Sequence, residues 1–188
     1  MLLTGSRPAV VGSPRAAAAH GIAYVPRERR DEALFGALTI RGNFSLPTLG
    51  EDVRAGLVDS RSSERRLRGF VDRLGIKLGR TSDDIGTLSG GNQQKVVLAR
   101  WLAANPRVLL LNDPTRGVDI GAKRDIYELL VGLASDGVAV VMLSTEVDEH
   151  VELMDRVLVF REHEVFAELP RAGVTRESLV SAFFGRAA

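Results

Sequence analysis

Ser89, Gly90 and Gly91 open a predicted helix that runs to about Ala104. Glycine lets backbone N–H groups approach an anion closely, and the helix dipole favours negative charge at the first turn. Ser89 adds a hydroxyl donor. We therefore predict that this corner binds the terminal phosphate of a nucleotide.

A second group of polar residues follows an apolar run, Val108 to Leu111. A run without alternation predicts a strand buried on both faces of a parallel sheet. Asn112 and Asp113 stand at its C-terminal end, where open α/β sheets bind ligands. The carboxylate of Asp113 could polarise a water for attack on a phosphate. Alternatively, Asp113 only caps the strand end.

These two motifs, in this order, resemble those of ATP-binding cassette (ABC) ATPases. Residues 88–95, LSGGNQQK, look like the signature motif, and residues 108–119, VLLLNDPTRGVD, look like the Walker B strand and D-loop. The likeness is closest to the second (C-terminal) cassette of monosaccharide importers of the ribose, xylose and galactose type. It extends from about Thr4 to Gly185. Two motifs joined by one helix and one strand are far more specific than a lone SGG.

The resemblance implies an α/β fold, a P-loop NTPase-like ABC cassette core with a mostly parallel sheet. It adds an antiparallel edge (residues 2–5 and 8–11) and a small helical lobe, about residues 40–88, inserted in the core. Residues 1–188 would form one partial ABC nucleotide-binding domain. A P-loop of the form GxxxxGK[ST] does not occur in the sequence. We therefore expect the N-terminal P-loop strand and helix, which contain Walker A, to be missing.

Several positions depart from the family pattern. The Walker B aspartate, which holds Mg²⁺ through water, is Asn112, and an amide lacks the charge that neutralises the metal. The glutamate that positions the attacking water is Asp113, which is shorter by one methylene. The switch histidine falls at Thr145. Arg27-Glu28-Arg29-Arg30 replace the Q-loop glutamine, and we interpret them as a solvated charged loop.

We therefore predict an intact signature half and a damaged hydrolytic half. Cassettes pair head to tail, so the resemblance assigns contacts with the γ-phosphate of ATP held by another cassette. The nucleotide-binding residues that it implies are Ser89, Gly90, Gly91, Gln93 and, in the D-loop, Asp119. Asp113 and Thr145 take the catalytic positions, and Asn112 takes the metal position. ATP and Mg²⁺ are the implied cofactors, but we expect no independent binding by this chain alone.

The implied function is ATP-driven monosaccharide uptake. Its partners would be a first cassette or a second copy of this chain, a membrane sugar permease and, indirectly, a periplasmic sugar-binding protein. A non-catalytic, regulatory or vestigial cassette fragment is one alternative. A soluble ABC-type ATPase acting on DNA is another, and it is disfavoured because the net charge is only +1 and no heptad pattern is sustained. We expect no nucleic-acid partner.

Composition is that of an ordinary soluble domain, with 45% hydrophobic and 26% charged residues and no cysteine. The longest wholly apolar run, residues 138–143, is far too short to cross a bilayer. Residues 1–3 are too few for a signal peptide. We expect a cytoplasmic protein, peripheral on the inner face of the plasma membrane through its partners.

Hydrophobic periodicity and the residues that start or stop helices predict the remaining elements. The helix over residues 59–74, capped by Ser60 or Ser62, has an arginine-rich face that is either solvated or a permease contact. Trp101 is interpreted as a core residue rather than a stacking platform. The three histidines are assigned structural roles, because no metal-ligand spacing links them. Strands are predicted at residues 21–26, 138–143 (buried), 156–161 and 165–169, and helices at residues 14–20, 120–134, 146–154 and 176–184.

Overall fold

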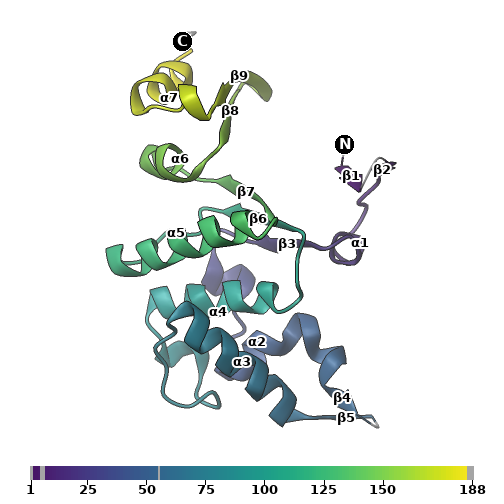
Figure 1. Ribbon diagram of the computed structural model, residues 1–188. Coiled ribbons are helices and arrows are strands. Elements are labelled where there is room, and N and C mark those ends of the chain that lie inside the picture. Colours follow the sequence, from purple (N-terminus) through teal and green to yellow (C-terminus); the bar gives the residue numbers. More distant parts are fainter. Residues whose placement is uncertain (1, 5–6, 55, 186–188) are drawn as a thin grey trace. The chain divides into compact units, whose positions relative to one another are not determined.

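The computed structural model describes residues 2–4, 7–54 and 56–185. The chain divides into two compact units, residues 1–142 and 143–188. Figure 1 labels the helices and strands of both units.

A three-stranded sheet lies at the centre of the first unit. Its strand order is β3 (Ile22–Val25), β6 (Val108–Asn112) and β7 (Ala139–Leu143). β3 and β6 run parallel, with Ile22 opposite Val108 and Val25 opposite Leu111. The parallel pairing places the carboxyl ends of β3 and β6 side by side. The loop after β3 and the polar residues after β6 therefore start from the same edge of the sheet.

Two helices position the candidate site. α4 (Gly90–Leu102) packs against β3 and against the next helix, α5 (Ile120–Ser135). Val96, Val97 and Leu98 of α4 are fully buried, while Trp101 is half-buried. α5 buries Ile126, Leu130 and Leu133.

Residues 40–88 contribute a group of helices that packs on α4. They are α2 (Ile40–Ser45), η2 (Leu46–Asp52), α3 (Ser60–Leu74) and η3 (Ile85–Thr87). Residues of α2, α3 and η3, with two from the loops beside them, share one apolar cluster with two residues of α4; its buried members are Ile40, Phe44, Leu67, Leu74, Ile76, Ile85, Leu88, Val96 and Ala99.

The ends of α3 follow from local chemistry. Its N-cap is Asp59, whose carboxylate accepts from the N–H of Arg61, so the prediction of Ser60 or Ser62 as the cap was wrong. A carboxylate satisfies the first-turn donors as well as a hydroxyl and adds a favourable charge at the helix N-terminus. Gly75 ends the helix with φ +58°, a left-handed conformation that glycine adopts easily.

Two arginines hold these helices together. Arg66 of α3 donates to both carboxylate oxygens of Asp52, each at 2.7 Å, and to Thr48 Oγ1 at 2.9 Å. Arg100 of α4 donates to the carbonyls of Asn43 and Ala33, and burial lowers its pKa to about 10. The arginine-rich face of α3 is thus not uniformly solvated; its exposed members are Arg61, Arg65 and Arg68.

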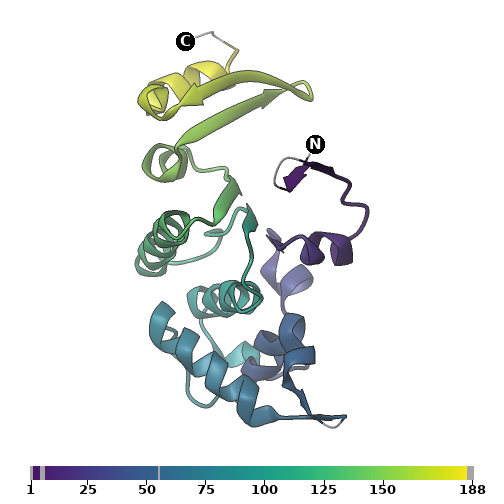
Figure 2. The ribbon, with the colours of Figure 1, turned by 45° about the vertical axis from the view of Figure 1, so that its right-hand side comes forward.

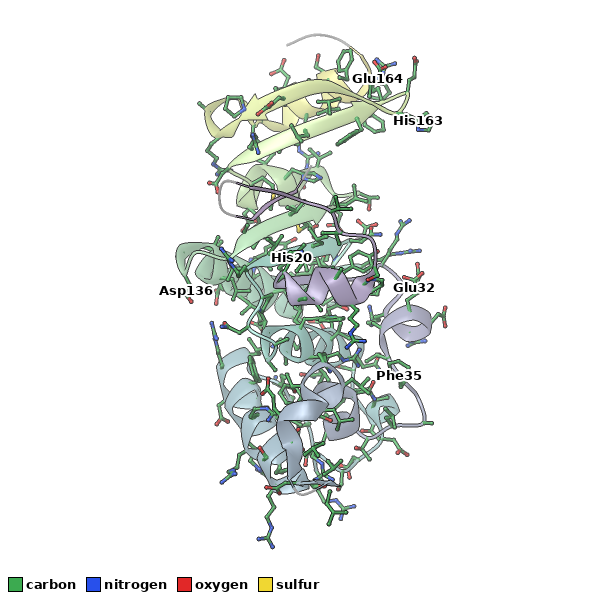
Figure 3. The ribbon with its side chains drawn as sticks, turned by 90° about the vertical axis from the view of Figure 1, so that its right-hand side faces the viewer. His20, Glu32, Phe35, Asp136, His163 and Glu164 are labelled. Atoms are coloured by element: carbon green, nitrogen blue, oxygen red, sulfur yellow. The ribbon has the colours of Figure 1, made fainter. Side chains whose placement is uncertain are left out.

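Short elements complete the first unit. β1 (Leu2–Thr4) and β2 (Arg7–Ala9) form an antiparallel pair apart from the central sheet, and Gly5 of the predicted edge lies outside the described residues. α1 (Pro14–Ala19) is capped by Ser13 and ends at His20, which Figure 3 labels. The others are η1 (Arg29–Ala33), β4 (Val53–Arg54) and β5 (Leu57–Val58).

β7 is not the buried strand that the sequence predicts. Val141 at its centre is 58% exposed, and Tyr24 of β3 is 47% exposed. In the described residues β7 pairs only with β6 and therefore forms an edge of the sheet. β6 is also less buried than predicted, because Leu109 and Leu111 are buried while Val108 and Leu110 are half-buried.

The second unit is a hairpin with two helices. β8 (Arg156–Arg161) and β9 (Glu164–Pro170) pair antiparallel, and α7 (Arg176–Phe183) packs on β8 and on α6 (Val147–Leu153), as Figure 2 shows. The short helix η4 (Arg171–Gly173) follows β9. Glu162 and His163 form the turn with φ +49° and +69°, and Figure 3 labels His163 at the hairpin tip. Positive φ at both central residues is typical of a type I′ turn.

Candidate functional site: the signature loop and the D-loop

Ser89 caps α4 and stays exposed. Its Oγ accepts hydrogen bonds from the backbone N–H of Asn92 and from Asn92 Nδ2, the latter at 2.9 Å. Across the described residues, neither the Ser89 hydroxyl hydrogen nor the N–H groups of Gly90 and Gly91 have an acceptor. Three donors are therefore available at the positive end of the α4 dipole.

The two glycines are also required by packing. A Cβ built at Gly91 would lie 2.6 Å from the Cβ of Ala122 and 3.2 Å from Asp119 Oδ2, so a side chain there would push α4 away from α5. A Cβ at Gly90 would lie 2.5 Å from Arg29 Nη2 and 3.1 Å from the carbonyl oxygen of Gly117. The absence of side chains thus brings the signature loop, residues 88–91, against the D-loop, residues 114–119.

Gln93 points away from the three donors. Its side chain is buried, and Nε2 donates to the carbonyls of Ile85 and Leu88 at 3.3 and 3.2 Å. Since both carbonyls belong to the segment that leads into α4, the amide braces the signature loop from inside. This geometry favours a supporting role over the predicted phosphate contact.

Asp119 caps α5 at the end of the D-loop. Its Oδ1 accepts from the N–H of Ala122 at 3.0 Å. The hydrogen bond from Ala122, followed by other backbone hydrogen bonds, lowers the pKa of Asp119. A carboxylate held by backbone donors fixes the start of α5 beside Gly91.

Asn112 and Asp113 lie at the end of β6, as the sequence predicts. Asp113 is 6% exposed, has φ +45°, and Arg27 Nε lies 2.8 Å from its Oδ2. Asn112 Nδ2 lies 3.5 Å from the hydroxyl of Tyr24. A neutral amide beside a carboxylate already paired with a guanidinium does not fit a Mg²⁺ site. In the part of the chain that the structure describes, no group of three His, Cys, Asp or Glu residues fits a metal either.

The segment Arg27–Arg29 is the part of the site that sequence reasoning missed. Glu28 pairs with Arg116, and Arg29 donates to the carbonyls of Arg116 and Gly117 at 2.7 and 3.1 Å. The interpretation as a solvated loop fits the exposure of Arg27 and Glu28, but it missed that all three residues reach the segment after β6. Arg27, Glu28 and Arg30 are exposed, while Arg29 is half-buried. The charges of Asp113 and Arg116 are opposite to those of Arg27 and Glu28, and this complementarity is the only hint of the pairing in the sequence.

Thr145 follows β7 and lies in the second unit, where it is exposed. Its neighbour Ser144 donates from Oγ to the buried carboxylate of Glu149. His150 Nε2 lies 3.0 Å from the carbonyl oxygen of Ser144. His150 thus braces the turn that carries Thr145, consistent with the structural role assigned to it.

Comparison with known proteins identifies the family. The ABC transporter family profile matches residues 6–116, which is more than half of the chain. The chain belongs to the ABC transporter family. It is similar to the ribose import ATP-binding protein RbsA 2 of Streptomyces avermitilis, with 48% identity over 94% of this chain and 35% of that protein. It is also similar to RbsA 1 of Streptomyces coelicolor, with 45% identity over 97% of this chain and 36% of that protein.

The chain spans about a third of the length of these curated relatives. Solved structures with the same fold include the dimeric ATP-binding cassette MJ0796 bound to ADP and Pi, with TM-score 0.70, 24% identity and coverage of 86% of this chain and 68% of that one. Another is cbiO1 from Clostridium perfringens, with TM-score 0.71, 22% identity and coverage of 97% and 68%. The α/β ABC cassette fold predicted from the sequence is confirmed. Within the described residues, no helix is both long and apolar enough to cross a membrane.

Proposed function

We propose that this ABC family member is part of the ATP-binding subunit of a sugar importer and offers its signature loop to ATP held by another cassette. Mg-ATP would be bound mainly by that partner. The whole would act as a peripheral cytoplasmic subunit on a membrane sugar permease, supplied by a periplasmic sugar-binding protein. The ribose import names of its relatives favour a monosaccharide as cargo.

The observation that carries this proposal is the set of three free donors at the N-terminus of α4. The exposed hydroxyl of Ser89 and the N–H groups of Gly90 and Gly91 lie together at the positive end of a helix of 13 residues. A γ-phosphate presented by a partner would accept these hydrogen bonds and meet the favourable dipole.

Hydrolysis by the chain's own β6 residues is not part of the proposal. Asp113 is paired with Arg27 through Oδ2, so one of its two carboxylate oxygens is already engaged in an ion pair. Asn112 does not supply the charge that Mg²⁺ coordination requires. The isolated chain is therefore expected to show no ATPase activity above background. Tight stoichiometric binding of Mg-ATP in equilibrium dialysis would contradict this part of the proposal.

The test is nucleotide-dependent association with a complete cassette that carries its own P-loop, taken from a ribose-import relative. Analytical ultracentrifugation should detect a complex with Mg-ATP and little or none with Mg-ADP. Ser89→Glu should abolish the complex, because it places a carboxylate against the phosphate. Ser82→Glu, at an exposed serine of the same unit, is the matched control and should associate normally. No complex with Mg-ATP for the unmodified chain would refute the proposal.

A non-catalytic regulatory cassette is the second candidate. The pairing of Arg27 with Asp113 favours it, because this contact engages the carboxylate at the end of β6 in an ion pair. If the complex forms with Mg-ATP but the partner's ATPase rate falls, the regulatory function is supported. A rate increase supports the transporting ATPase.

A further inference from the structure

Arg29 reaches from the loop after β3 to the D-loop. Its Nη1 donates to the carbonyl of Arg116 at 2.7 Å and its Nη2 to the carbonyl of Gly117 at 3.1 Å. Two successive main-chain carbonyls are therefore held by one planar group. Lysine does not reproduce this arrangement, because its donors all lie on one nitrogen and it lacks the planar fork of two nitrogens.

The same guanidinium lies against the signature loop. A Cβ at Gly90 would come within 2.5 Å of Arg29 Nη2, and within 3.1 Å of the Gly117 carbonyl oxygen that this atom binds. Three segments, at residues 29, 90 and 116–117, thus meet around one side chain. Gly90 is the residue type that leaves room for it.

The charge of Arg29 is costly at this place. Its guanidinium lies near the N-terminus of α4, where the helix dipole already disfavours a cation. Burial first, and then the neighbouring Arg30, lower the pKa of Arg29, while Glu28 raises it. Two carbonyls offset part of this cost, and an anion at Ser89 would offset more. A guanidinium at this unfavourable position beside α4 indicates that Arg29 does something that a neutral side chain cannot do.

We propose that Arg29 is a positioning residue for the signature loop. By holding the carbonyls of Arg116 and Gly117 it sets the D-loop against Gly90, and so directs Ser89 and the Gly90 N–H toward a phosphate. This inference rests on the function proposed above. It assigns to Arg29 an effect on nucleotide-dependent association without direct contact between Arg29 and the nucleotide.

The first test uses the association assay with the complete partner cassette and Mg-ATP. Arg29→Ala should weaken association about tenfold, the loss expected when charge-assisted hydrogen bonds are removed. Arg29→Lys should fail to restore it, because the two-carbonyl fork is lost. Arg30→Ala, at the exposed neighbour, is the control and should bind like the unmodified chain. Unchanged association of Arg29→Ala would overturn the inference.

The second test is a double-mutant cycle between Arg29 and Gly90. Gly90→Ala should weaken association about tenfold on its own, since the new methyl group displaces the guanidinium. In the Arg29→Ala background, the same change should cost less than about threefold. If the two effects instead multiply as independent factors, Arg29 does not act through Gly90 and the inference fails.

A third measurement needs no partner and separates this inference from the proposed function. The amides of Arg116 and Val118 are hydrogen-bonded within the D-loop turn, to the carbonyls of Asp113 and Thr115. In the isolated chain, Arg29→Ala should make both amides exchange with solvent about tenfold faster, while Arg30→Ala should not. Unchanged exchange would overturn the inference even if the unmodified chain binds no partner.

Discussion

Arg27 Nε lies 2.8 Å from Oδ2 of Asp113, and this ion pair joins the loop after β3 to the end of β6. The two side chains differ in exposure, at 44% for Arg27 and 5% for Asp113. The Asp113 carboxylate is thus nearly removed from water, while its partner is half solvated. Removal of the arginine should cost more than removal of an ordinary surface charge, because a buried carboxylate then loses its counter-charge.

We predict that Arg27→Ala lowers the free energy of unfolding by about 1–3 kcal/mol. Arg30→Ala, in the same loop but exposed, should change it by less than about 0.5 kcal/mol. Urea denaturation of the two variants beside the unmodified chain is the measurement. Equal midpoints for Arg27→Ala and Arg30→Ala would show that the ion pair contributes nothing.

Gly91→Ala should destabilise the first unit. The new methyl group would lie 2.6 Å from the Cβ of Ala122, which is neither flexible nor at the end of a long side chain. We expect a loss of about 1–3 kcal/mol from overpacking between α4 and α5. Ala122→Gly in the same chain should recover most of this loss, because it removes the opposing methyl group.

Gly132→Ala is the matched control for Gly91→Ala. Nothing lies within 4 Å of a Cβ at Gly132, which also stands in a helix, α5. This change should stabilise the chain by about 0.5–1 kcal/mol through helix propensity alone. Thermal melts followed by circular dichroism measure whether each variant is more or less stable than the unmodified chain. A destabilising Gly132→Ala would contradict the packing explanation.

Glu64 should make the stability of the first unit sensitive to acid. A hydrogen bond from Thr81 is the main cause that lowers the pKa of Glu64 below 4.5, with further contributions from Arg68 and Arg41. A carboxyl whose pKa is lower in the folded state stabilises the fold above its unfolded pKa. That contribution is lost as pH falls through the lower, folded value.

Unfolding free energies measured at pH values between about 6 and 3 should therefore fall more steeply for the unmodified chain than for Glu64→Gln. The pH dependence of Thr81→Ala should lie between those of the unmodified chain and Glu64→Gln, since this change removes the largest cause of the lowered pKa of Glu64. Ser82→Ala, at the exposed neighbour of Thr81, should follow the unmodified chain. Parallel curves for the unmodified chain and Glu64→Gln would refute this assignment.

Exposure of β7 predicts self-association. An edge strand with exposed apolar side chains is a template for pairing with another chain. Val141, at 58% exposure, lies at its centre, and Val131 of α5 has a similar exposure of 53%. Val141→Thr should reduce self-association in size-exclusion chromatography with light scattering. Val131→Thr should not, and an unmodified chain that runs as a monomer would contradict the prediction.

The local elements could be predicted because short-range chemistry determines them. Ser13 before Pro14, Asp119 before Ile120 and Thr175 before Arg176 are residue types that favour helix caps, and each accepts a backbone hydrogen bond from the first turn. A cap satisfies donors within three residues of itself, so its sequence signal is contained in that stretch. The hairpin turn at Glu162 and His163 is likewise a local feature, because it only has to join two strands that are adjacent in the sequence.

Long-range charge pairs were not predictable in the same way. The four charged residues after β3 read as a solvated loop, since nothing within their own stretch needs them. In the structure Arg27, Glu28 and Arg29 contact Asp113, Arg116 and the D-loop carbonyls, more than 80 positions away in the chain. Only the parallel pairing of β3 with β6 brings these two segments to one edge of the sheet.

By itself the sequence determined the family, the order of the strands and helices and the position of the corner that we propose as a phosphate site, because a helix start with Ser89, Gly90 and Gly91 is a local feature with its own chemistry. Tertiary structure decided what surrounds that corner. It turned Gln93 inward, set Gly91 against Ala122 and placed Arg29 between the signature loop and the D-loop. These outcomes depend on how closely two backbones approach, and that distance is set by packing between segments far apart in the chain.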